Sequence, residues 1–274
     1  MTVKPIHSLV AGIMEGVGEP ALLLPAGATP HSYSLRPSDA RKLARADLVI
    51  RVGPALESFL TKPLANIAHR ARVITLMGDA HLSLIQHSGH DGHGGHGGHD
   101  DQETDPHIWL DPENARRIVS YVTAVLARAD PDNGSRYSAN SKKILARIDR
   151  LDAAVASILA PVRGAPYIVF HDGYQYFERR YGLTHVAAIT LSPERIPGAR
   201  RLQQIRDIIR AKGARCVFTE PQFSPALAHA LTRGANTRIA ALDPLGDGIP
   251  PGPESWFKMM RGLATSLRAC LAGR

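Results

Sequence analysis

Five histidines recur at a strict three-residue spacing within one glycine-rich stretch of the chain. Apart from Ser88 and Asp91 the spacers are all glycine, and the histidines are His87, His90, His93, His96 and His99. A stretch without apolar side chains gains too little from burial to offset the entropy cost of ordering, so we expect a mobile loop. Imidazole is the most common protein ligand for late first-row metals. An internal position argues against an expression tag. The stretch therefore predicts an auxiliary metal site, of low affinity because glycine leaves the ligands unorganised.

Four further groups that can bind a metal follow predicted strands or the loop beyond them. They are His31, beyond the apolar run Ala21–Leu24; His107, after the long segment Asp79–Asp105; His171, after Tyr167–Phe170; and Asp243, after Arg238–Leu242. Open α/β sheets place ligand sites at the carboxyl ends of strands, so a cleft between two halves of the chain can gather all four. A single histidine is more often structural, and it is the joint placement that favours a site. Three imidazoles and a carboxylate suit tetrahedral zinc better than manganese, which prefers oxygen.

Short apolar runs alternate with helical patterns on both sides of the chain's midpoint. The expected strands are Val3–Ile6, Ala21–Leu24, Leu48–Val52 and Val73–Leu76, then Tyr167–Phe170, His185–Ile189, Cys216–Thr219 and Arg238–Leu242. Amphipathic segments follow most of these runs, and the rhythm of strand and helix indicates parallel sheets. We therefore predict an α/β fold of two lobes, each a roughly four-stranded, mainly parallel sheet flanked by helices.

One long amphipathic segment separates the two sets of strands. Between Arg136 and Pro161, apolar residues including Ile144, Ile148 and Val155 keep a 3.6-residue period. A helix of this length spans roughly 35–40 Å, enough to run along a small domain and join two lobes. The expected organisation is an N-terminal lobe over 1–133 with the histidine-rich loop at 79–105, a linking helix over 134–161, and a C-terminal lobe over 162–274.

The composition is that of an ordinary globular protein, with 274 residues, 44% hydrophobic and 21% charged. The net charge of +8 raises nucleic acid or an anionic membrane face as partners. The densest basic segment, Arg195–Arg215, contains no aromatic residue on which bases could stack, so we interpret it as a solvated helix face and expect no nucleic-acid partner. No apolar run reaches the ~18 residues of a transmembrane helix.

Two other features leave alternatives open. Glu220 ends the predicted strand Cys216–Thr219 and is suited either to lining a cleft or to serving as a general base, which would make the protein a zinc-dependent hydrolase. No HExxH, GxSxG or phosphate-loop motif accompanies it. The two cysteines, Cys216 and Cys270, fit either one disulfide or two buried thiols.

Several motifs in a fixed order resemble the metal-binding proteins of zinc ABC importers, the ZnuA type. They are KPIHSLVAGIMEGVGEP, HSYSLRPSD, the histidine-rich stretch, DPHIWLDP, FHDGYQYF and LDPLG, and together they extend over nearly the whole chain. The resemblance implies two α/β lobes bridged by one long helix, with zinc bound between them by His31, His107 and His171, and with Asp243 as a further ligand. It also implies a disulfide between Cys216 and Cys270, and with it an oxidising compartment.

The function that the resemblance implies is that of a solute-binding component, which captures Zn²⁺ and hands it to a membrane permease. We expect a monomer, located in the periplasm or otherwise outside the cytoplasm, whose leader is missing from this sequence. One departure from the family pattern matters. Some zinc-specific members have an acidic residue immediately before the first ligand histidine, and this chain has Pro30 there. The fourth position then falls to Asp243 or to water. A manganese or other divalent-metal carrier is the alternative within the same class.

Overall fold

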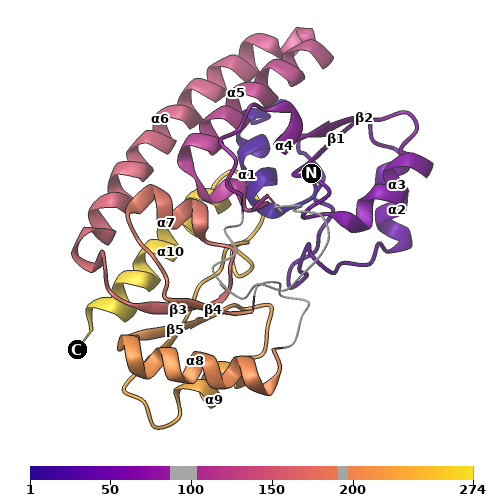
Figure 1. Ribbon diagram of the computed structural model, residues 1–274. Helices are drawn as coiled ribbons and strands as arrows, with labels where there is room; N and C mark the ends of the chain where they lie inside the picture. Colours follow the sequence, from indigo (N-terminus) through magenta and orange to yellow (C-terminus); the bar gives the residue numbers. More distant parts are fainter. Residues whose placement is uncertain (87–103, 191–196, 274) are drawn as a thin grey trace.

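The computed structural model describes residues 1–86, 104–190 and 197–273 (Figure 1). Its strands form two sheets in which all neighbours run parallel, one with the order β1-β2 and one with the order β4-β3-β5-β6. Helices pack on these sheets and one long helix lies between them in the chain. The predicted α/β class is confirmed. The histidine-rich stretch from His87 to His99 lies outside the described residues.

The second sheet follows the sequence prediction closely. Its elements are β3 (Tyr167–His171), α7 (Gln175–Tyr181), β4 (Ala187–Thr190), α8 (Ala199–Lys212), β5 (Cys216–Thr219), α9 (Ala226–Thr232) and β6 (Arg238–Ala241). Side chains alternate along β3: Tyr167 and Val169 join the large central core, whereas Ile168 and Phe170 pack in a smaller cluster with α8. Figure 1 shows α8 and α9 together on one face of this sheet. Because His171 continues the odd-numbered series, the alternation directs it toward the central side.

The first half differs from the prediction at its start. The sequence predicts a strand over Val3–Ile6, but the structure has helix α1 (Lys4–Ile13) there. Pro5 occupies the first turn, where its missing N–H costs nothing. The apolar residues Ile6, Leu9 and Ile13 are all buried, at a spacing that places them on one helical stripe. The strand prediction was wrong because Val3, Pro5 and Ile6 belong to a longer helical pattern that continues to Ile13.

The first sheet is also smaller than expected. It holds β1 (Leu48–Arg51) and β2 (Arg72–Thr75), two strands in the described residues where four were predicted. Ala21–Leu24 forms no named strand, although Leu23 and Leu24 donate backbone hydrogen bonds to the oxygens of Met1 and Thr2. The remaining helices of this part are α2 (Pro37–Ala44), α3 (Thr61–Asn66) and α4 (Leu76–Asp79).

Three long helices tie the two sheets together. They are α5 (Pro112–Ala129), α6 (Gly134–Leu159) and α10 (Ser255–Ala272). With 26 residues, α6 extends for about 39 Å, and Figure 1 shows it beside α5 along one side of the molecule. The C-terminal helix α10 packs on both α6 and α1, so a single central core contains side chains from either side of α6. The boundaries proposed for two lobes, at 133/134 and 161/162, stay a prediction.

The disulfide between Cys216 and Cys270 is present, with 6.2 Å between the two Cα atoms. It joins β5 to α10. Because α10 packs in the central core, the disulfide also links the second sheet to that core. The alternative of two buried thiols is excluded.

Replacing both cysteines by serine should lower the free energy of unfolding by about 2–4 kcal/mol, because the cross-link restricts the unfolded chain. Denaturant titration of the parent and of C216S/C270S measures the difference. A reductant should destabilise the parent to the same extent and leave the double variant unchanged. Two titratable thiols in the unfolded, unreduced parent would contradict the pairing.

Across residues 1–86, 104–190 and 197–273, none of the helices has both the length and the apolar character needed to cross a bilayer.

Candidate metal centre

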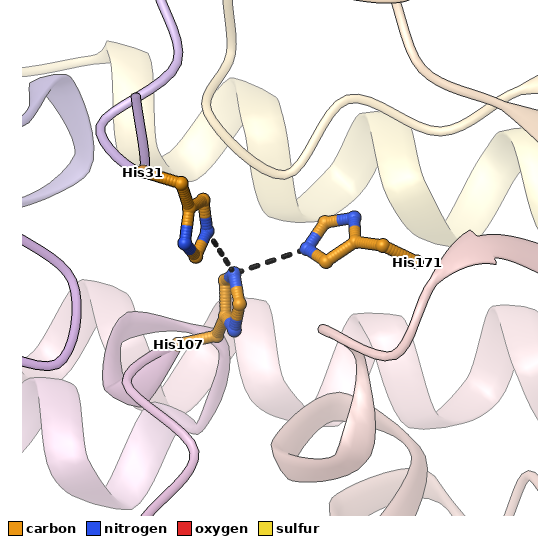
Figure 2. Close-up of side chains that lie close together, drawn as sticks. All are labelled: His31, His107 and His171. Atoms are coloured by element: carbon orange, nitrogen blue, oxygen red, sulfur yellow. Dashed lines mark hydrogen bonds between the residues drawn. The ribbon is translucent and has the colours of Figure 1, made fainter. Parts of the chain in front are cut away.

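Three histidines from distant parts of the chain converge on one point (Figure 2). His31 lies in the loop before α2, His107 immediately precedes the 3₁₀ turn Ile108–Leu110, and His171 is the last residue of β3. The Nε2 atom of His107 is 3.4 Å from Nε2 of His31 and 3.2 Å from Nε2 of His171. One ligand atom from each ring can be chosen so that all three lie within 4.8 Å of one another.

These spacings match the geometry of a bound zinc ion. Two nitrogens that each lie 2.0–2.1 Å from zinc at a tetrahedral angle are about 3.3–3.4 Å apart. The 3.2 and 3.4 Å separations are therefore those expected when His107 shares one ion with each of its neighbours. The described residues contain no other cluster of three metal-binding side chains.

A carboxylate stands behind each of the two buried histidines. Asp105 Oδ1 is 2.7 Å from Nδ1 of His107, and Glu220 Oε1 is 2.6 Å from Nδ1 of His171. Each carboxylate accepts the Nδ1 hydrogen, so the lone pair of Nε2 is left free to face the metal. Asp105 also accepts the backbone N–H of His107 at 2.9 Å, and Tyr174 donates its hydroxyl to Glu220 at 3.2 Å. Both rings are thus held in orientation and tautomer.

The pKa values of His31 and His171 are shifted in opposite directions. Burial, followed by the charges of the nearby His107 and His171 rings, lowers the pKa of His31 to about 2, so this ring is neutral and ready to bind a cation. For His171, burial also acts to lower the pKa, but the charge and hydrogen bond of Glu220 outweigh it and the pKa is raised. A zinc ion that binds His171 therefore competes with protons more strongly than it would at an ordinary imidazole.

The backbone after β3 is shaped to leave room for the imidazole. Gly173 donates its N–H to the oxygen of His171 at 2.9 Å, which makes a tight turn. A Cβ atom at Gly173 would collide with the ring of His171, so only glycine fits. The space among the three rings is a cavity of about 10 Å³, room for one water-sized group. Its walls are completed by Thr29, Pro30, Glu220, Gln222, Phe223, Pro244 and Leu245.

Asp243 does not join the three histidines. Its carboxylate turns toward its own loop, where it accepts the backbone N–H groups of Leu245 at 3.2 Å and Asp247 at 2.5 Å. Asp243 and Glu220 both follow strands at the carboxyl edge of the second sheet, as the sequence predicts. Only Glu220 meets a histidine of the cluster, because β5 is the direct neighbour of β3 and β6 is one strand further away. No role for Asp105 was drawn from the sequence. Its position two residues before a candidate ligand was the available signal.

The chain matches the sequence profile of the ZnuA family, described as the periplasmic component A of a zinc-uptake complex, over residues 1–270. It is 39% identical to the high-affinity zinc uptake system protein ZnuA of Brucella suis, an alignment that covers 99% of this chain and 91% of that protein. The protein of the same name from Yersinia pestis is 36% identical and is covered to 90%, with 98% of this chain aligned.

Solved structures show the same fold. A ZnuA crystal structure superposes with a TM-score of 0.83 at 24% identity, covering 98% of this chain and 96% of that one. The periplasmic zinc-binding protein TroA from Treponema pallidum gives a TM-score of 0.84 at 21% identity, covering 98% of this chain and 97% of that one.

Proposed function

The chain belongs to the ZnuA family of periplasmic zinc-uptake components, and from this premise we propose that it holds its cargo Zn²⁺ on His31, His107 and His171. Members of this family are binding components of transporters and not enzymes; this chain serves a zinc ABC importer in the periplasm and delivers the ion to the membrane permease. A monomeric state stays a prediction.

The observation that supports the proposed site is the zinc-like spacing of the His107 Nε2 atom from Nε2 of His31 and from Nε2 of His171, with two of the three rings backed by carboxylates. Imidazole nitrogens favour zinc over manganese, which prefers oxygen ligands. We assign the fourth position to water, since Asp243 is hydrogen-bonded within its own loop and Pro30 has no side-chain donor or acceptor. A hydrolytic role for Glu220 is not favoured, because its carboxylate is engaged by His171 and Tyr174.

The direct test is a zinc titration in competition with a chelator of nanomolar affinity. The metal-free chain should withdraw about one equivalent of zinc, and X-ray absorption of that complex should show three imidazole nitrogens and one oxygen at about 2.0–2.1 Å. Manganese at the same concentration should fail to displace the zinc. Inability to compete with the chelator, or a shell made mainly of oxygen, would refute the assignment.

The histidine-rich stretch is proposed to catch additional zinc beside the main site. The residues that border it are described: Gln86 and Thr104 form a β-bridge, and Asp105 donates its backbone N–H to the oxygen of Ile85 at 2.8 Å. Since Asp105 also backs His107, the described residues that flank the stretch lie next to the proposed centre.

Deleting Gly89–Asp100 should lower the total zinc stoichiometry and leave the tightest site nearly unchanged. The ligands lost on deletion are separated by glycine, and closing such a segment around an ion costs conformational entropy. Calorimetry of the parent and the deletion variant at pH 7.5 measures both quantities. The weaker sites of the parent should disappear first near pH 6, because an unorganised imidazole protonates near ~6.5. Loss of the tightest site on deletion would mean that one of the deleted histidines is a ligand of the main centre.

A further inference from the structure

The segment Asp243–Ile249, which follows β6, forms a compact turn beside the three histidines. The carboxylate of Asp243 organises it by accepting the N–H groups of Leu245, Asp247 and Gly248. Its second residue, Pro244, accepts the indole N–H of Trp109 at 2.8 Å, and Pro244 lines the histidine cavity. The turn therefore has a defined shape and a fixed place next to His107.

Lys4 anchors this turn to the first half of the chain. Its ammonium donates to the backbone oxygens of Gly246 at 2.8 Å, Asp247 at 3.0 Å and Ile249 at 3.1 Å. Three acceptors match the three hydrogens of an ammonium group, and the residue is buried to 6% exposure. Burial lowers the pKa of Lys4, an effect that the carboxylates of Asp247 and Asp243 partly offset. A buried ammonium with all its hydrogens used is a rigid attachment and not a solvated charge.

The side chain of Asp247 extends from the anchored turn to the loop that carries His31. Its Oδ1 atom accepts the backbone N–H of Gly27 at 2.6 Å and lies 4.0 Å from the ammonium of Lys4. Gly27 has a φ of +77°, a left-handed conformation that glycine adopts without strain. Four residues later in this loop comes His31, and Pro30 between them limits the backbone further.

His31 is the ligand that most needs such support. His171 is the last residue of a strand, and both His171 and His107 are buried. His31 is only half-buried and lies in a loop outside any helix or strand. Figure 2 shows it approaching His107 from its own segment of the chain.

We propose that Asp247, held in place by Lys4, is a positioning residue for zinc binding that fixes the Gly27–His31 loop so that His31 completes the ligand set. The inference rests on the proposed function, because it assumes that His31 is a zinc ligand. In this proposal the LDPLGDG segment connects the Gly27–His31 loop to the segment that carries His107, which it contacts through Pro244 and Trp109.

The test is a double-mutant cycle between Asp247 and His31, read out as zinc affinity by chelator competition. Asp247→Ala should weaken zinc binding about tenfold, the effect of losing a charge-assisted hydrogen bond that orders the ligand loop. Asp247→Asn keeps an oxygen acceptor for Gly27 and should recover most of the affinity. In a chain that already carries His31→Ala, Asp247→Ala should change the affinity less than about twofold, because no ligand remains for it to position. Asp132→Ala, at an exposed acidic residue, is the matched control and should behave as the parent.

The possible results distinguish a failure of the positioning role of Asp247 from a failure of the proposed zinc site. Equal losses from Asp247→Ala in the two backgrounds would indicate a general structural role and overturn the inference. Parent affinity in Asp247→Ala, with a large loss in His31→Ala, would overturn the inference alone. Parent affinity in His31→Ala would overturn both the ligand set and the inference. Thermal unfolding of each metal-free variant identifies any variant that has failed to fold, and Asp247→Asn then carries the test.

Discussion

Replacing His171 by alanine is expected to weaken zinc binding by about a hundredfold or more. Losing the carboxylate behind a ligand histidine costs about 10–100-fold, so losing the ligand itself must cost at least as much. His171 is the residue to choose because β3 and Glu220 fix its ring before zinc arrives. Among the described residues, the cavity wall offers no replacement nitrogen, since the lining residues other than His31 and His107 provide oxygen, amide or apolar groups.

Chelator competition on metal-free protein measures the loss, and His229→Ala is the matched control. His229 lies on α9 in the same half of the chain and is exposed, away from the cluster. That control should bind zinc as the parent does. If His171→Ala kept the parent affinity, the proposed centre would be wrong. His31→Ala and His107→Ala should also weaken zinc binding strongly, because each removes one of the three proposed ligands.

The second large effect is expected at the carboxylates behind the rings. Glu220→Gln should weaken zinc binding about 10–100-fold, because the amide cannot supply the negative charge that makes His171 a better donor to the metal. Asp105→Asn should act in the same way through His107. Glu178→Gln is the matched control: its carboxylate lies 2.9 Å from Nδ1 of His185, a pair of the same kind that does not face the three histidines. Equal effects of Glu178→Gln and Glu220→Gln would point to general destabilisation.

The same substitution should change the pH dependence of zinc binding. Glu220 raises the pKa of His171, so in the parent protein a proton and the zinc ion compete for this ring. The zinc affinity therefore falls as the pH drops below the raised pKa, by up to about tenfold per pH unit for one proton. Without the carboxylate charge the pKa of His171 falls, and the onset of this competition moves to lower pH. The affinity of Glu220→Gln at pH 8 should thus be lower than that of the parent, with a smaller further loss between pH 8 and 6. If the zinc affinities of the parent and of Glu220→Gln fell by the same factor between pH 8 and 6, the proposed effect of Glu220 on His171 would be contradicted.

The sequence predicted the second sheet better than the first for a physical reason. The strand Cys216–Thr219 was predicted at its observed bounds and Tyr167–Phe170 to within one residue, because a buried parallel strand is a continuous apolar run. At the start of the chain both patterns coexist. Val3–Ile6 is apolar enough for a strand, but Pro5 in a first turn followed by the helical period of Ile6, Leu9 and Ile13 decides for α1.

The site was predictable in its histidines and less so in its carboxylates. Strand-end placement and the family motifs singled out His31, His107 and His171, which the fold brings together. The same rule could not choose between Glu220 and Asp243, since both end strands at one edge. The strand order β4-β3-β5-β6 makes the choice, and that order depends on which runs pair in space, which no local pattern encodes.

The central core shared across α6 bears on how the carrier can load and unload. Trp109 and Trp256 are fully buried in it, and Trp256 donates its indole N–H to the oxygen of Trp109 at 2.9 Å. Rotating the two sheets apart would expose both indoles and pull α10 away from α1, and the loss of that apolar contact opposes such a motion. The body of the molecule should therefore behave as a stiff frame, and the ion should enter and leave by displacement of a ligand loop. A permease that receives zinc from such a protein would need to contact only the region of the ligand loop and would not have to separate the two sheets.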